Sequence, residues 1–89
     1  MKKFEVVRDD RLGEVGLKVG DVIEAYTRDE VNERENAEVY QSEHEGVYFF
    51  PVPKEFIPVE IVMISEIFDK PLPYAEINES TIIDFKEVE

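Results

Sequence analysis

The sequence predicts a mainly β domain, a small five-stranded barrel followed by an acidic C-terminal extension. The chain has 89 residues, which allows a single core because so short a chain buries only about 60% of its unfolded surface. Hydrophobic residues make up 43% of it, in short runs that charge interrupts, and no long amphipathic helix pattern separates these runs. We expect residues 1–64 to form the barrel, with residues 65–89 packing on it or pairing with it.

The first two strands are expected near the N-terminus. Residues 4–7 favour a strand, and the charged stretch that follows ends on Gly13, as a loop would. Glycine frees the backbone for positive φ, so a turn is predicted at Gly20 and Asp21. Residues 22–27 are β-branched and aromatic, which predicts the second strand.

The most polar part of the chain is residues 28–36. Its acidic side chains surround a single apolar residue, Val31, so the segment has no apolar face to bury. We therefore expect an exposed acidic loop here.

A hairpin is predicted in the middle of the chain. Residues 38–42 and 47–50 read as strands on either side of residues 43–46, and Gly46 can adopt the left-handed conformation that closes such a turn. Pro51, Pro53 and Pro58 then allow only a short helical turn before residues 59–64, which predict the last barrel strand.

The extension, residues 65–89, is acidic and is broken by Pro71 and Pro73. Residues 81–85 can pair with an edge of the barrel, whereas residues 74–77 can equally begin a short helix. Periodicity over so few residues does not choose between these alternatives.

Two segments together resemble the Src-homology-3-like barrels, including small examples from bacterial and phage proteins. Residues 17–23, Leu-Lys-Val-Gly-Asp-Val-Ile, look like the diverging turn of that fold, and residues 46–60 look like its last hairpin strand, proline, helical turn and final strand. The resemblance covers residues 3–64 and implies the barrel and a phage or prophage origin. The chain has no tryptophan, and Phe56 stands where the groove tyrosine would be, so the resemblance does not extend to proline-rich peptide binding.

The charge of the chain limits its partners. Twenty-two acidic residues against ten basic ones give a formal charge of −12, which opposes direct binding to nucleic acid or to an anionic membrane. Three interpretations stay open: a partner protein with a basic or apolar patch, mimicry of nucleic acid by acids in residues 29–45 and in the extension, and simple solubility.

The residues offer little for catalysis or metal binding. There is no cysteine, and His44, the only histidine, lies between Glu43 and Glu45 at the predicted hairpin tip. Neighbouring strand residues point to opposite faces, so a metal would need ligands from elsewhere. The serines lack a glycine elbow. We expect no enzymatic activity, cofactor or metal, and the absence of a signal-like N-terminus predicts a cytoplasmic protein.

The leading hypothesis is therefore a non-enzymatic protein-interaction module, and the alternative is an inhibitor that mimics nucleic acid. Strand alternation places Tyr48 and Phe50 on one face and Phe49 on the other. Either the extension covers the outer face, or Phe49 is exposed for a partner. The candidate partner-binding residues are acids of the polar loop and aromatic or proline residues of the barrel, namely Asp29, Glu30, Glu33, Glu35, Phe49, Pro51 and Phe56.

Overall fold

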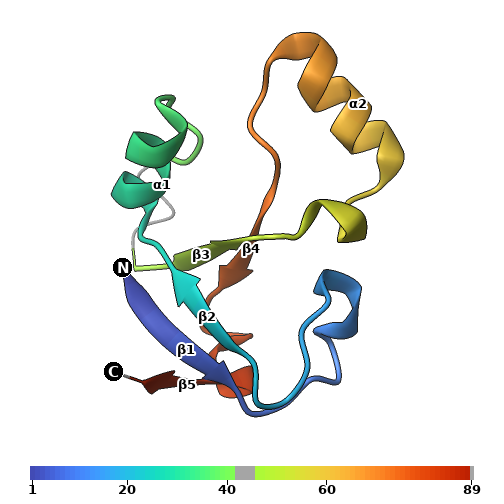
Figure 1. Ribbon diagram of the computed structural model, residues 1–89. Coiled ribbons are helices and arrows are strands. Elements are labelled where there is room, and N and C mark those ends of the chain that lie inside the picture. The colour runs from blue at the N-terminus through green and yellow to red at the C-terminus, as the bar shows by residue number, and fades with distance from the viewer. Residues whose placement is uncertain (42–45, 89) are drawn as a thin grey trace.

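The computed structural model describes residues 1–41 and 46–88. These residues form five strands in two antiparallel sheets, together with two α-helices, so the fold is mixed α/β (Figure 1). The two helices are α1, Arg28–Glu35, and α2, Val59–Phe68. The strands are β1, Lys2–Val6; β2, Val22–Ala25; β3, Tyr48–Pro51; β4, Tyr74–Ile77; and β5, Phe85–Val88.

The first sheet has the strand order β2-β1-β5, so β1 lies between strands from the beginning and the end of the chain. Phe4 of β1 lies opposite Ile23 of β2 on one side and Glu87 of β5 on the other. The strands predicted at residues 4–7 and 22–27 are confirmed. The turn before β2 is also present, with Gly20 at φ 98° and the Asp21 N–H donating to the Lys18 carbonyl over 3.0 Å.

The second sheet contains β3 and β4, with Phe50 opposite Ala75. It meets the first sheet at a single bridge, where the amides of Tyr26 and Phe49 donate to each other's carbonyls over 2.7 and 2.8 Å. The expected strand in residues 47–50 is confirmed. Among the described residues the ladders form two sheets rather than one continuous barrel.

The main core lies between the two sheets and is built largely of aromatic rings. Phe85 packs edge-to-face against Phe4 and Phe50, with ring centroids 6.2 and 6.0 Å apart. Val6 and Ile77 are also fully buried in this cluster. Residues 65–89 thus supply a strand to each sheet and two side chains, Ile77 and Phe85, to the core. The short helix considered for residues 74–77 does not form, because they are strand β4, and of residues 81–85 only Phe85 joins a strand, β5, after a 3₁₀ turn at Ile82–Asp84.

The loop predicted for residues 28–36 is wrong, because this segment is helix α1. The Thr27 hydroxyl accepts from the Glu30 N–H, and the Glu30 carboxylate accepts from the Thr27 N–H, which together form a capping box. Val31 is completely buried. One apolar anchor and a strong N-terminal cap are sufficient for two turns of helix held against the sheet.

The strand predicted for residues 59–64 is also wrong, because these residues begin helix α2. The short helical turn expected before it is present as a 3₁₀ turn at Lys54–Phe56. The β preference of the valines and isoleucines is a weak and context-dependent one, and the apolar residues of this segment also fit helical spacing, at 59, 63 and 67 and at 61, 64 and 68. Figure 1 shows α2 set apart from both sheets, joined to β3 through the 3₁₀ turn and to β4 by an extended segment.

The predicted central hairpin does not form as expected. Residues 38–41 are not a strand, and residues 42–45, which include most of the predicted tip, lie outside the described residues. The amides of Val39 and Tyr40 instead donate to the side-chain oxygen of Asn32 over 2.9 and 3.0 Å. The position beside β3 is taken by β4, which comes from the C-terminal part of the chain.

Candidate functional site

Helix α2 exposes large apolar side chains along most of its surface. Val59 and Ile67 are 69% and 70% exposed, and Phe68 is 63% exposed. Isolated apolar side chains on a protein surface are normal, but a contiguous group of them marks an interaction site. The full set of exposed apolar side chains on α2 is Val59, Ile61, Met63, Ile64, Ile67 and Phe68.

The spacing of these residues organises them into two adjacent rows. Residues three or four apart share a face of an α-helix. Val59, Met63 and Ile67 form one row, and Ile61, Ile64 and Phe68 form the other. A helix that is apolar nearly all round is normally found buried inside a larger structure. In this chain most of that surface faces outward.

The contact between α2 and the rest of the domain is narrow. Ser65 is the buried residue of the helix and Val62 is half-buried, one turn before it. The Ser65 carbonyl accepts from the amides of Asp69 and Lys70, which ends the helix with Asp69 in the left-handed conformation. Capping and this narrow strip hold α2 in place, and its two apolar rows are left uncovered by the described residues.

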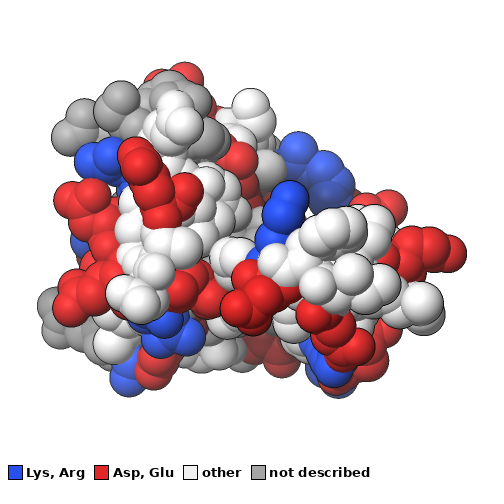
Figure 2. Space-filling view, turned by 90° about the horizontal axis from the view of Figure 1, so that it is seen from above, with Lys and Arg blue, Asp and Glu red and all other residues white. Residues whose placement is uncertain are grey.

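Acidic side chains border the apolar surface of α2 and also interrupt it, because Glu60 lies between the two rows. Glu60 and Glu66 lie on the helix and Asp69 caps it, whereas Val59–Phe68 contains no lysine or arginine. Lys54 is 3.5 Å from Glu66, and Lys70 lies 6.0 Å from the centre of the Phe68 ring. Figure 2, which looks from above onto the end of the molecule that carries α2, shows uncharged surface with acidic and some basic side chains around it.

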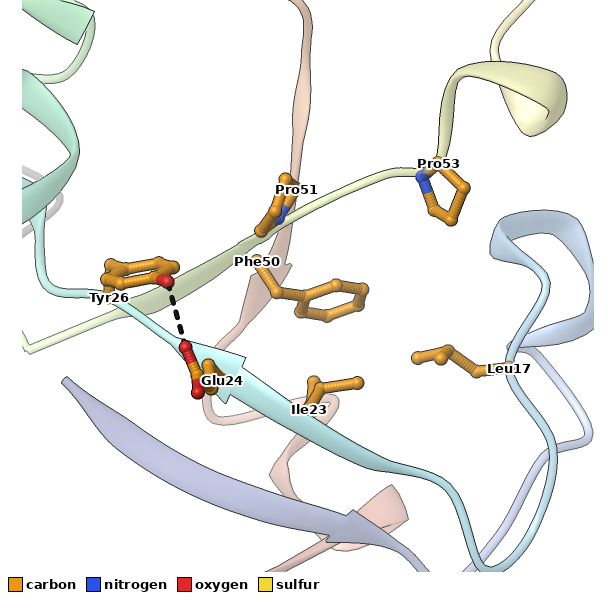
Figure 3. A pocket seen from close by; sticks show the side chains of 7 residues that line it. All are labelled: Leu17, Ile23, Glu24, Tyr26, Phe50, Pro51 and Pro53. Atoms are coloured by element: carbon orange, nitrogen blue, oxygen red, sulfur yellow. Dashed lines mark hydrogen bonds between the residues drawn. The ribbon is translucent and has the colours of Figure 1, made fainter. Parts of the chain in front are cut away.

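A separate apolar groove lies between β2 and β3, with a volume of about 260 Å³. In Figure 3 the side chains of Leu17, Ile23 and Phe50 point into the same space from three segments of the chain, and Pro51 and Pro53 stand along one side. The groove exists because β2 and β3 are joined only at Tyr26 and Phe49 and diverge beyond that bridge. It is therefore a product of the two-sheet arrangement.

One end of this groove is polar. The Tyr26 hydroxyl donates to the Glu24 carboxylate over 3.2 Å, and Glu24 is exposed. The guanidinium of Arg34 lies 4.1 Å from the centre of the Tyr26 ring. Burial raises the pKa of Tyr26 above its usual value, so this hydroxyl keeps its proton and its role as a donor. Glu24 is the one charged residue that lines the groove.

Phe49 does not serve as an exposed partner-binding residue, because it is 1% exposed. Its ring is stacked on Tyr40, with centroids 4.0 Å apart, and its backbone bridges to Tyr26. The expectation of an exposed Phe49 is therefore wrong. The C-terminal extension supplies strand β4, which pairs with β3. The Phe49 ring itself is covered by Tyr40, from the middle of the chain.

Pro51 and Phe56 are both exposed but lie in different surroundings. Pro51 lines the groove. Phe56 is 45% exposed and lies over the backbone of Gly16, where an added Cβ would come within 2.3 Å of the Phe56 ring. The close approach of ring and backbone gives Phe56 a packing role, holding the first loop against the 3₁₀ turn before α2.

The four acids of residues 28–36 that were named as candidate partner-binding residues lie on α1 and make different contacts. The Glu30 carboxylate is 2.5 Å from the N-terminal ammonium, and the Glu35 carboxylate accepts from the Tyr74 hydroxyl over 2.5 Å. Asp29 is 82% exposed and pairs with Arg28, and Glu33 is exposed. Two of the four acids thus support the fold. Mimicry of nucleic acid stays a prediction.

Residues that could hold a metal or cofactor are sparse in the described part of the chain. Residues 1–41 and 46–88 contain no cluster of three or more histidine, cysteine, aspartate or glutamate side chains suited to a metal. His44 and its two neighbouring glutamates lie outside the described residues. Neither α2 nor the groove was singled out from the sequence. The signal for α2 was present, because apolar residues at 59, 63 and 67 and at 61, 64 and 68 fit helical spacing.

Comparison of this chain with family models, with characterised proteins and with solved structures finds no match. The resemblance to Src-homology-3-like barrels, and the phage or prophage origin that it implies, stay predictions. Within the described residues, no helix is both long enough and apolar enough to cross a membrane.

Proposed function

We propose that this protein is a small, acidic, non-enzymatic protein-interaction module and that α2 is its main binding element. The observation that carries the proposal is the exposure of six large apolar side chains on one ten-residue helix. Full burial of such a side chain contributes about 1.5–3 kcal/mol. A partner that covers even part of the two rows therefore gains substantial binding free energy.

The chemistry around α2 defines the partner that fits it. Two parallel apolar rows on a short helix suit a hydrophobic groove on another protein, the mode in which anchor residues recur at helical spacing. Glu66 and Asp69 lie at the edge of these rows and Glu60 lies between them, so we expect the partner's groove to carry lysine or arginine opposite these acids. Complementary charge of this kind speeds association and selects partners more than it adds affinity.

The charge of the chain favours such a partner over a second copy of the protein. Each chain carries a formal charge of −12, and two α2 helices would bring like-charged rims together. Repulsion between like charges opposes self-association. Because salt screens this repulsion, added salt would favour a dimer. Added salt would instead weaken binding to a groove with a basic rim, because it screens the attraction between opposite charges.

The proposal is tested by placing a photo-reactive amino acid at Ile64, on the exposed side of α2, and at Ile83 as a control. Ile83 is also apolar and 56% exposed but lies outside α2. Cross-linking in a host lysate is expected to give a discrete adduct from position 64 only. Purified partner should then bind the wild type, bind Met63→Glu/Ile67→Glu at least about tenfold more weakly, and bind Ile83→Glu normally.

Two outcomes would overturn the proposal. One is equal cross-linking from positions 64 and 83, which would show that α2 is not a preferred contact. The other is wild-type affinity for the Met63→Glu/Ile67→Glu variant. Both residues are more than half exposed, and circular dichroism establishes whether the variant keeps its fold.

A further inference from the structure

The groove between β2 and β3 lies beside an unpaired strand edge. In the sheet order β2-β1-β5, β2 is an edge strand whose one full partner is β1. Its outer side meets β3 only at the bridge between Tyr26 and Phe49. Across the described residues no strand pairs with the outer side of Val22–Ala25. Free backbone donors and acceptors along an edge form a template for another extended chain.

The apolar groove and the free edge occupy the same place in the fold. Ile23 and Glu24 belong to β2 and also line the groove, with Leu17 at one end and Phe50 between Ile23 and the two prolines (Figure 3). A strand laid beside β2 projects alternate side chains to the same face. One of these side chains would therefore enter the groove while the backbone of the strand pairs with β2.

The charge at the groove favours a basic residue next to that apolar side chain on the added strand. Glu24 is exposed and is the one charged residue in the lining. Its partner within the groove is the neutral Tyr26 hydroxyl, 3.2 Å away. A lysine or arginine on the added strand would complement the carboxylate, and the charge of −12 on the whole chain would draw in such a segment.

We propose that this groove is a second binding site, separate from α2, for an extended peptide segment that places a large apolar side chain between Leu17, Ile23 and Phe50 and a basic side chain at Glu24. The peptide adds to β2 as an antiparallel or parallel strand. Strand addition obtains affinity from main-chain hydrogen bonds and specificity from pockets for alternate side chains. A partner bound at α2 leaves this groove free, so the module can bind an extended peptide segment at the same time.

The test uses a panel of short, fluorescently labelled, amidated peptides that carry leucine, isoleucine, phenylalanine, methionine or tryptophan beside arginine, with threonine elsewhere. Fluorescence anisotropy with the full chain is expected to show saturable binding for at least one member. Replacing its apolar residue with alanine should weaken binding about tenfold or more, since tenfold corresponds to 1.4 kcal/mol. N-methylation of the backbone amides that face β2 should abolish binding.

Variants of the protein locate the site. Glu24→Gln should weaken binding several-fold and reduce its dependence on salt, whereas Glu79→Gln, the same charge change at an exposed residue outside the groove, should not. The α2 variant Met63→Glu/Ile67→Glu should bind the peptide as the wild type does. This distinguishes a failure at the groove from a failure of the function proposed for α2.

Three results would overturn the inference. They are an absence of saturable binding across the whole panel, binding that is insensitive to N-methylation, and equal effects of Glu24→Gln and Glu79→Gln. A Leu17→Ala variant provides an independent check. Leu17 lines the groove from a loop rather than a strand, so its truncation should weaken binding without altering the edge of β2.

Discussion

Arg11 donates a hydrogen bond from its guanidinium to the carboxylate of Asp84 over 2.9 Å, joining the loop after β1 to the turn before β5. The Asp84 side chain is 3% exposed, whereas that of Arg11 is 52% exposed. The Asp84 carbonyl also accepts from the amides of Val7 and Arg8. The buried Asp84 carboxylate, near the end of the chain, therefore depends on the Arg11 guanidinium for a hydrogen bond and a compensating charge.

Replacement of Arg11 should therefore destabilise the domain. Arg11→Ala leaves the Asp84 carboxylate buried without its charged donor, and an unsatisfied buried group costs about 1–3 kcal/mol in the free energy of unfolding. Urea unfolding measures this loss. Arg8→Ala is the control, because Arg8 pairs with exposed Asp10 and such pairs contribute about 0–1 kcal/mol. Equal losses in the two variants would contradict the prediction.

The contact of Phe56 with the backbone of Gly16 predicts a steric conflict. Gly16 has φ 77°, and a Cβ there would lie 2.3 Å from the Phe56 ring. Gly16→Ala should lower the free energy of unfolding by about 1–3 kcal/mol, through left-handed backbone strain and this clash. Gly13→Ala has nothing within 4 Å of the added Cβ and should change stability by less than about 0.5 kcal/mol.

A double variant separates the two causes at Gly16. In Gly16→Ala/Phe56→Ala the clash is removed while the backbone strain remains. The double variant should therefore be more stable than the sum of the two single changes predicts. Strict additivity in urea unfolding would show that the Phe56 ring does not constrain this position.

Glu30 makes the stability of the domain depend on acid pH. The hydrogen bond from the N-terminal ammonium, followed by that from the Thr27 backbone, holds the pKa of Glu30 below its ordinary value of 4.5. A carboxylate with a depressed folded-state pKa contributes stability above its unfolded-state pKa, and that stability is lost as pH falls through the folded-state pKa. Glu30→Gln should thus be less stable than wild type near neutrality.

The difference between wild type and Glu30→Gln should shrink as pH falls below 4.5 and Glu30 becomes protonated. Thermal unfolding at a series of pH values measures it. Glu33→Gln on the same helix is the matched control, because the exposed Glu33 carboxylate has no hydrogen bond or ion pair with the other described residues, and the hydrogen bond from the Asn36 amide goes to the Glu33 backbone carbonyl instead. A difference that stays constant with pH would contradict the assignment.

The exposure of α2 predicts that its apolar side chains contribute little to stability. Ile67→Ala removes a side chain that is 70% exposed and should change the free energy of unfolding by less than about 0.5 kcal/mol. Val31→Ala removes the fully buried anchor of α1 and should cost about 2 kcal/mol. A large loss from Ile67→Ala would show that α2 packs against the domain rather than projecting from it.

Local patterns predicted the elements that depend on local chemistry. The strands at β1, β2 and β3, the turn at Gly20 and the 3₁₀ turn between Pro53 and Pro58 were all found where β-branched runs, glycine and proline indicated them. The capping box of α1 was also readable, since Thr27 precedes Glu30 by three residues. An acidic segment with one apolar residue can therefore still be helical where a capping box starts it.

The elements that local patterns failed to predict depend on contacts between distant segments. Residues 59–64 have the β-branched composition of a strand, yet β4 and β5, which follow them in the chain, take the positions beside β3 and β1. Residues 59–68 join neither sheet and satisfy their backbone hydrogen bonds within a helix instead. Likewise the burial of Phe49 depends on Tyr40 reaching its ring.

Length, the formal charge of −12, the lack of cysteine and the short β-branched runs are properties of the chain alone, so they could be predicted without a structure. Which apolar residues are covered depends instead on the tertiary structure. It buries Phe49, leaves α2 uncovered and opens a groove at Glu24 where β2 and β3 diverge. Burial depends on which strands pair across the chain, and short-range patterns carry no information on that pairing.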